Sequence, residues 1–429
     1  MSDVHLALLI FFPALLFLGV PIYASLGLTG LLVTWLTDSP LVFATQSILN
    51  GLDNFPLLAI PMFILAGNIM ERGGLTNDII RVFRHAFGHI SGSLGIVTIF
   101  SCMFFAAISG SGPGTVAAIG AILIPAMIRY GYPAPYAAAV TATGGTLGVL
   151  IPPSNPMIIY AIIANVSIAD MFAAGMVPGL IVGLSLAAVA WLVARRSGIR
   201  LASDEEAERA SSIGALLWQA KFALAMPPII LGGIYSGLFT PVEAAVVAVF
   251  YALSVSLLVY RELTWAGLRE AFDGAVRMSG ALMIVVACST LFARVITFER
   301  IPQELVELFG AVSANPLVIL LCINALLLVV GTFMETISAI IILAPILVPL
   351  VKSFGIDPVH FGIILIVNIE IAFLTPPLGV NLFVASQIAN IRIERIFRAI
   401  LPFILTLLVL LALVSLVPAL SLFVPSLLR

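Results

Sequence analysis

Long apolar segments, separated by short polar or glycine- and proline-rich breaks, follow one another along almost the whole chain. Four apolar pieces are too short to cross a bilayer and form two pairs, 92–108 with 115–128 and 315–331 with 336–350. Because small or polar residues interrupt each pair, we predict two re-entrant helical hairpins, near 92–128 and 315–350. The longer segments predict membrane crossings near 4–21, 24–37, 56–71, 134–166, 171–194, 222–236, 240–260, 278–297, 358–390 and 399–425.

The second half of the chain resembles the first. A proline pair at Pro152–Pro153 recurs at Pro376–Pro377, which is 376 minus 152, or 224, residues later. Both pairs interrupt a long apolar segment, 134–166 in one half and 358–390 in the other. We therefore predict an all-α polytopic membrane protein with two inverted-topology repeats, 1–194 and 222–429, joined by a linker at 195–221. Each repeat would contain one re-entrant hairpin and one broken transmembrane helix, as in secondary transporters.

Composition places the chain in a lipid bilayer. Of its 429 residues, 62% are hydrophobic and only 9% are charged, more apolar surface than a soluble fold could bury. The net charge of −2 gives no sign of a nucleic-acid partner. The three cysteines are isolated from one another, and His85 and His89 have Arg81 and Arg84 beside them, so we expect neither a disulfide framework nor a metal site at these residues.

The distribution of Lys and Arg predicts the orientation of the chain. If the linker is cytoplasmic, the predicted crossings place only Arg294, Arg300, Lys352 and Arg429 of the 19 basic residues outside. This imbalance is the one that the positive-inside rule requires, so we expect both termini on the outer side of the membrane. Residues 265–276 are expected to form an interfacial amphipathic helix next to the crossing at 278–297.

The predicted hairpin tips and the two broken crossings are the candidate functional regions. Proline frees backbone carbonyl groups upstream of each break, and Ser109, Ser111, Thr332 and Thr375 add hydroxyl oxygens beside them. Neutral oxygens suit sodium, whereas the N-termini of half-helices suit an anionic substrate. The alternative is that these proline-, glycine- and serine-rich clusters are only helix kinks or points of close packing. A purely structural role is less expected here, because four clusters occur at matching positions in two repeats.

Few carboxylates lie in the apolar segments. Glu243 follows Thr240 and Pro241 at a predicted helix start, where helix capping is the expected role. Glu335 in the second hairpin tip and Glu370 near the second break are intramembrane acids, and so are candidates for a functional role. No nucleophile, zinc or nucleotide motif occurs in a suitable context, so we do not expect an enzyme.

At these motifs the chain resembles the large membrane subunit of tripartite ATP-independent periplasmic (TRAP) transporters. The resemblance covers essentially the whole chain. It rests on the segment Ile-Pro-Pro-Ser-Asn-Pro-Met at 151–157 and on the segments 56–67, 108–111, 237–244, 355–362 and 374–383.

Several properties follow as implications of this resemblance. The fold would be of the elevator type, and the protein would import an organic anion, such as a dicarboxylate or sialic acid, coupled to sodium. A periplasmic binding protein would deliver the substrate, and a small four-helix membrane subunit would pack against the scaffold. Because the large-subunit pattern starts near the first residue, we expect that small subunit to be a separate polypeptide.

The resemblance also implies site residues. A first sodium site would use Ser109, Ser111, Gly148, Ile151 and Pro153, and a second would use Gly331, Ala372, Thr375 and Leu378. We expect the substrate to contact neighbours of these sites, namely Gly112, Ser154, Asn155, Thr332, Glu335, Gly379 and Asn381. The alternative function is a stand-alone sodium- or proton-coupled anion symporter of the same inverted-repeat superfamily.

Overall fold

The computed structural model describes residues 3–90, 92–196, 213–376 and 378–428, and all regular secondary structure in these ranges is helical, as predicted. The helices of the first half are α1 (Asp3–Leu6), α2 (Phe12–Phe17), α3 (Ile22–Leu36), α4 (Leu41–Leu52), α5 (Ala59–Arg72), α6 (Leu75–Phe87), α7 (Ser93–Ser109), α8 (Gly112–Arg129), α9 (Ala134–Leu150), α10 (Asn155–Ala164) and α11 (Ile168–Arg196). Those of the second half are α12 (Ile213–Tyr235), α13 (Pro241–Ser254), α14 (Trp265–Phe298), α15 (Ile301–Val312), α16 (Pro316–Gly331), α17 (Thr336–Ser353), α18 (Pro358–Ala372), α19 (Val380–Ala389), α20 (Ile393–Leu416) and α21 (Ala419–Leu428). A 3₁₀ turn at Phe55–Leu58 precedes α5, and π-helical turns occupy Ala7–Phe11 and Val255–Tyr260.

In the described part of the chain, eight helices are long and apolar enough to cross a membrane. The number rises to ten if two bent helix pairs each count as one crossing. One of these pairs is α9 with α10, which meet at a bend of 40° across the first proline pair. The predicted break in the 134–166 segment is therefore confirmed, and α18 and α19 flank a second break at 373–379.

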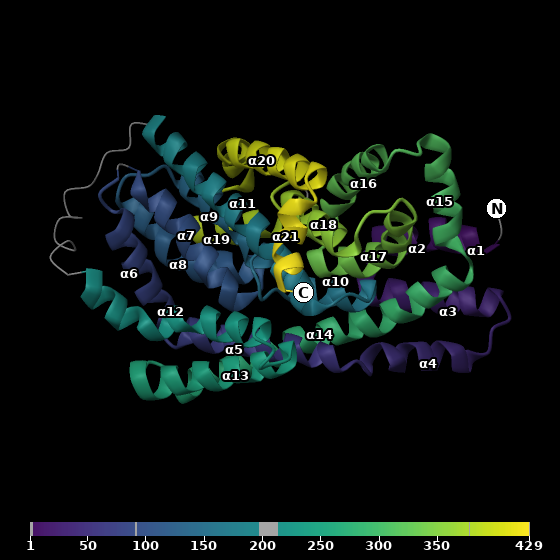
Figure 1. Cartoon of the computed structure of the whole chain (residues 1–429), viewed down its shortest axis with the longest axis horizontal. Coiled ribbons are helices and arrows are strands. Elements are labelled where there is room, and N and C mark those ends of the chain that lie inside the picture. The colour runs from purple at the N-terminus through teal and green to yellow at the C-terminus, as the bar shows by residue number, and fades with distance from the viewer. Residues whose placement is uncertain (1–2, 91, 197–212, 377, 429) are drawn as a thin grey trace.

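The helices form two bodies that meet along one interface. A layer of helices runs along the lower edge of the molecule in Figure 1, and we call α3, α4, α5, α12, α13 and α14 the lower layer. Within it, α14 packs against α3, α4 and α5, while α13 packs against α5 and α12. Helices α7–α11 and α16–α21 form a bundle above this layer, and we call them the helix bundle.

Helix starts recur at the spacing that the proline pairs predict. Helix α8 begins at Gly112 and α17 at Thr336, and α9 begins at Ala134 and α18 at Pro358, a difference of 224 residues in both cases. The next long helices keep nearly the same spacing: α11 begins at Ile168 and α20 at Ile393, which is 225 residues later. The two halves of the bundle therefore share one order of elements: a helix pair, a broken helix and a long helix.

Each half of the bundle also packs its broken helix onto the helix pair of the other half. Helix α10 packs against α17, and α19 packs against α8 and α9. A hydrogen bond adds to this exchange, because the Tyr160 hydroxyl of α10 donates to the backbone oxygen of Pro358 at 2.6 Å. The side chains of Tyr160, Phe172, Phe361 and Phe403 are almost fully buried, so a closely packed core lies inside the bundle.

Three predictions of element boundaries are wrong. The expected interfacial helix at 265–276 and the crossing at 278–297 form one 34-residue helix, α14, because no proline lies between them to end the helix. The crossing expected at 399–425 ends at Leu416, since the residue before Pro418 is driven out of the helical region. Part of the expected linker is helical: 195–196 belong to α11 and 213–221 to α12.

Residues 197–212 of that linker and Pro377 of the second proline pair lie outside the described residues. Helices α4, α6 and α15 were not predicted. Each has only 12 or 13 residues, whereas the predictions relied on apolar segments long enough to cross a membrane. The capping role predicted for Glu243 is confirmed, because its Oε2 accepts a 2.8 Å hydrogen bond from the Thr240 backbone N–H.

A chain of amide side chains joins three helices of the bundle. The Nδ2 of Asn368 in α18 donates to Oδ1 of Asn324 in α16 at 2.9 Å, and Nδ2 of Asn324 donates to the Ser415 hydroxyl in α20 at 2.9 Å. Asn368 is fully buried, so water cannot replace Asn324 as the hydrogen-bond partner of its amide. These bonds fix α16, α18 and α20 relative to one another.

We expect Asn324→Leu to lower the free energy of unfolding by on the order of 1 kcal/mol, because it leaves the buried Asn368 amide without its partner. Combining it with Asn368→Leu removes the unpaired amide, so the double variant should be more stable than the sum of the single effects predicts. Equilibrium unfolding in mixed micelles measures the coupling. Strictly additive effects would show that the two amides do not interact.

Candidate functional site

A cavity of about 420 Å³ lies between the lower layer and the helix bundle, and we call it the central cavity. Its size lies within the range that small-molecule sites occupy. The bundle contributes the α7–α8 turn at 109–114, the start of α10 and the start of α17, and the lower layer contributes α5 and α14. Both predicted hairpin tips and the first break therefore meet at one space.

Hydroxyl and carbonyl oxygens are concentrated at the turn between α7 and α8. Ser109 Oγ lies 2.9 Å from Thr115 Oγ1, and Thr115 Oγ1 donates to the backbone oxygen of Ser111 at 2.8 Å. Gly110 adopts the left-handed conformation with φ of 58°, which lets the chain reverse between the two helices. The Ser111 hydroxyl caps α8 by accepting a hydrogen bond from the Gly114 N–H.

This turn is docked on the first break. The Asn155 N–H donates to the Gly110 carbonyl oxygen at 3.4 Å. A Cβ atom at Gly148 would lie only 2.4 Å from the Ser111 carbonyl oxygen and 2.6 Å from Thr115 Oγ1, so a glycine is needed there. Four of the five residues predicted for the first sodium site, Ser109, Ser111, Gly148 and Pro153, thus meet around this contact, whereas the Ile151 side chain lies against Gly179 of α11.

The second turn and second break make the equivalent contact. The Leu378 N–H donates to the Thr332 carbonyl oxygen at 3.2 Å, and a Cβ atom at Gly331 would lie 2.7 Å from the Ala372 Cβ. The Thr375 N–H donates to the Ala372 carbonyl oxygen at 2.9 Å. All four residues predicted for the second sodium site, Gly331, Ala372, Thr375 and Leu378, therefore lie within one connected group.

The acids beside the second turn are held in different ways. Glu335 caps α17, because its Oε2 accepts hydrogen bonds from the Ser338 N–H at 3.1 Å and from the Ser338 hydroxyl at 3.3 Å. Glu370 is buried in α18, where Oε1 accepts a 2.9 Å hydrogen bond from the Thr336 hydroxyl. Its other oxygen, Oε2, is buried without a hydrogen-bond partner among the described residues.

Two asparagine side chains at the starts of the half-helices also lack partners. Asn155 begins α10 and Asn381 lies in the first turn of α19, and both amides are buried with no hydrogen bond in the described part of the chain. Asn381 reaches the other half of the bundle: a Cβ atom at Gly112 would lie 3.3 Å from its Oδ1. Buried amides without partners carry unused donors and acceptors, which a ligand can satisfy.

The predicted substrate residues divide into two groups. Gly112, Asn155 and Glu335 line the central cavity. Ser154, Thr332, Gly379 and Asn381 do not line it. Ser154 caps α10, and Gly379 turns the chain into α19 with φ of 43°. Thr332 contacts the second break through its backbone.

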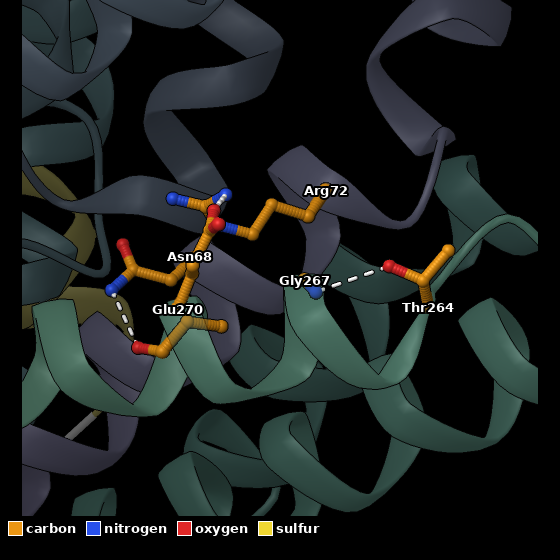
Figure 2. A network of polar contacts seen from close by, with 6 residues as sticks. Asn68, Arg72, Thr264, Gly267 and Glu270 are labelled. Carbon is orange, nitrogen blue, oxygen red and sulfur yellow. Dashed lines mark hydrogen bonds and ion pairs between the residues drawn. The ribbon is translucent and has the colours of Figure 1, made fainter.

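The sequence analysis missed the wall of the cavity that the lower layer provides. Asn68 and Glu71 of α5 and Met278 of α14 line it, although they lie far from both breaks in the sequence. As Figure 2 shows, Asn68 Nδ2 donates to the Ala271 carbonyl oxygen at 3.1 Å and Arg72 pairs with Glu270, so α5 and α14 are joined at this end of the cavity. The sequence feature that could have indicated this wall is the presence of two polar residues, Asn68 and Glu71, in an otherwise apolar segment.

The charge of the cavity lining is one-sided. Glu71 and Glu335 line the cavity, whereas the described lining residues include no Lys or Arg. Together with the serine hydroxyls of the first turn, these acids make a lining that favours a cation.

Comparison with known proteins identifies the family. The family description "Tripartite ATP-independent periplasmic transporter, DctM component" matches residues 9–420. The chain belongs to this family. Its relatives are permease subunits, so it is a transporter component and not an enzyme, as predicted.

Three relatives illustrate the similarity of this DctM component to named permeases. The "C4-dicarboxylate TRAP transporter large permease protein DctM" of Pseudomonas aeruginosa is 42% identical over 405 residues, which cover 94% of each chain. The "Sialic acid TRAP transporter large permease protein SiaM" of Vibrio cholerae is 39% identical over 415 residues, covering 96% of each chain. The "Isethionate TRAP transporter permease protein DctMQ" of Oleidesulfovibrio alaskensis is 42% identical over 414 residues, and the chain spans only 65% of its length.

Solved structures share the fold at low sequence identity. The Alcanivorax borkumensis YdaH transporter aligns with a TM-score of 0.62 at 14% identity, covering 88% of each chain. The MtrF protein of Neisseria gonorrhoeae aligns with a TM-score of 0.59 at 13% identity, covering 87% of this chain and 83% of that one.

We expect Gly148→Ala to abolish transport by this DctM component, because the added Cβ would push the Ser111 carbonyl oxygen and Thr115 hydroxyl away from the first break. The matched control is Gly280→Ala in α14, where a Cβ atom would meet nothing within 4 Å. Uptake by cells that express equal amounts of each variant provides the measurement. Full transport by Gly148→Ala would show that this close contact is dispensable.

Proposed function

We propose that the chain is the large subunit of a sodium-coupled importer that moves an organic anion across the bacterial inner membrane. A periplasmic binding protein delivers the anion, and a small four-helix membrane subunit packs against the lower layer. The observation that carries the proposal is the meeting of both turns and the first break at one cavity in a member of the TRAP family.

Sodium fits the groups that face this region. The first turn gathers two hydroxyl oxygens and the Ser111 carbonyl oxygen within a few residues. At the second break, the Thr375 hydroxyl lies beside the Ile371 carbonyl oxygen, to which it donates a hydrogen bond. Neutral oxygen ligands of this kind suit a hard monovalent cation better than they suit a proton. The two sodium sites are placed at the turn-and-break contacts described above, one in each half of the bundle.

The substrate class follows from the relatives and from the lining. The named relatives transport C4-dicarboxylates, sialic acid or isethionate, all of which are organic anions. Two bound sodium ions would offset the negative lining of the central cavity, so a carboxylate enters only together with its coupling ions. The unpartnered amide of Asn155, beside the helix N-terminus of α10, would donate to that carboxylate.

The division into two bodies supports an elevator movement. The lower layer serves as the fixed scaffold, and the helix bundle, with its two inverted-topology repeats, carries ions and substrate. The central cavity extends toward Asn68, Glu71 and the Arg72–Glu270 pair, at the end that the positive-inside rule assigns to the cytoplasm. We therefore interpret this conformation as inward-facing, with the chain termini and the far end of α14 in the periplasm.

Reconstituting the transporter from its components tests the proposed function. Proteoliposomes that contain this chain, the small membrane subunit and the binding protein should take up substrate when a sodium gradient is imposed. Leaving out any one protein, or replacing the sodium gradient by a proton gradient, should reduce uptake to the background of empty liposomes.

Other outcomes identify the alternatives. Saturable uptake by this chain alone would favour the stand-alone symporter. Uptake by the complete system on a proton gradient without sodium would contradict sodium coupling.

Thr375→Val should raise the sodium concentration needed for half-maximal transport. The Thr375 hydroxyl donates to the Ile371 carbonyl oxygen at 3.2 Å, so its own oxygen keeps lone pairs for an ion at the second break. Losing one oxygen ligand costs about 1–3 kcal/mol, or roughly a five- to hundredfold weaker binding step.

The matched control for Thr375→Val is Thr406→Val in α20. Thr406 makes the same type of bond, to the Pro402 carbonyl oxygen at 2.8 Å, but lies on an exposed helix surface away from both breaks. Wild-type sodium activation in well-folded Thr375→Val protein would exclude a ligand role.

A further inference from the structure

A second cavity, of about 770 Å³, lies at the opposite end of the interface between the two bodies. Three helices, α10, α14 and α17, contribute to the lining of both cavities. Helix α14 contributes Met278 to the central cavity and Val286–Phe298 to the second, and α17 contributes its first residues to the central cavity and Ile341–Lys352 to the second. The two cavities therefore lie in series along one interface, and α10 runs from the first break beside the central cavity to Asn165 beside the second.

The charge of this second cavity is opposite to that of the central cavity. Arg294 of α14 and Lys352 of α17 line it, and none of its described lining residues is Asp or Glu. Both cations are exposed, and neither makes an ion pair with a described residue. The rest of the polar lining consists of neutral amides and hydroxyls, namely Asn50, Asn54, Asn165, Ser289, Thr290 and Thr297.

We propose that this cationic cavity binds a soluble organic anion between Arg294 and Lys352. It would be a first binding site on the side from which substrate arrives, separate from the sodium sites. The inference rests on the proposed function for the identity of the anion and the direction of entry. The binding itself rests on the two cations, the absence of acids from the described lining and the size of the cavity.

The two cations belong to different bodies. Arg294 lies in the lower layer, and Lys352 lies at the end of α17 in the helix bundle. An anion with two carboxylates, or with one carboxylate and further oxygens, can contact both cations at once. A cavity lined by one sign of charge also concentrates ions of the opposite sign from solution, and this effect weakens as ionic strength rises.

The neutral lining favours a soluble organic acid over a lipid headgroup. Six amide or hydroxyl side chains provide both donors and acceptors, more than one phosphate group uses. An organic acid that carries hydroxyl or keto groups beside its carboxylate matches this mixture. We therefore assign the cavity to such an anion, and binding of an anionic lipid is an outcome that the experiment distinguishes.

The test measures the reactivity of a thiol placed in the cavity, independently of transport. Thr297→Cys is introduced into the full-length chain after Cys288 and Cys322 are changed to serine, while the fully buried Cys102 remains. In phosphatidylcholine nanodiscs, an anionic methanethiosulfonate should label this thiol about tenfold faster than a cationic one, because the cavity concentrates anions. Succinate should slow the labelling, and its neutral analogue succinamide should not.

Variants and controls decide the interpretation. Arg294→Gln and Lys352→Gln should each weaken protection by succinate roughly fivefold, and together they should remove the preference for the anionic reagent. The control is Arg300→Gln, which removes a cation at the same end of the molecule that does not line the cavity. Raising the salt concentration should reduce the preference in the parent protein only.

Three results would overturn the inference: equal labelling by both reagents, an effect of Arg300→Gln as large as that of Arg294→Gln, or loss of labelling in phosphatidylglycerol nanodiscs without any effect of succinate. The last result would assign the cavity to a lipid headgroup. If reconstituted uptake fails while succinate still protects the thiol, the proposed function is wrong but the anion site remains.

Discussion

Unpaired backbone groups are costly in a membrane interior, and the structure depends on how the two breaks in its helices satisfy them. Each break is docked on the turn of its own half: Asn155 donates its N–H to the Gly110 carbonyl oxygen, and Leu378 donates its N–H to the Thr332 carbonyl oxygen. One such bond between a break and a turn lies in each half of the bundle. Breaks of this kind are stable only when covered by protein or water, so the requirement for coverage is what brings the turns and the breaks together.

The same requirement explains why neither half of the bundle is complete alone. Helix α10 of the first half packs on α17 of the second, and α19 of the second half packs on α8 and α9 of the first. Asn381 approaches Gly112 across this boundary, so the polar groups near the first turn include a side chain from the other half. A movement of the bundle relative to the lower layer would therefore carry both turns and both breaks as one unit.

The sequence could predict what depends on local chemistry. The proline pairs located the breaks, and apolar length located α11 and α13, because bilayer thickness and the missing proline N–H act within one segment. Asn68 and Glu71 were missed because nothing near them in the sequence indicates that α5 faces the turns at 109–114 and 331–336. The short helices α4 and α15 were missed for a different reason: they cover neighbouring helices rather than cross a membrane, so length gives no signal.

The two cavities show how charge can be arranged along a path for ions and anions. An organic anion and a sodium ion attract each other, but each also needs a place where it is stable before the other arrives. Acids and the neutral oxygens of the first turn line the central cavity, and bases line the second one. Under the proposed function, an anion held at Arg294 and Lys352 would gain little by moving inward until cations occupied the central region. Coupling between the two solutes would then arise from electrostatics, because the anion would meet a favourable potential in the central cavity only after sodium had bound.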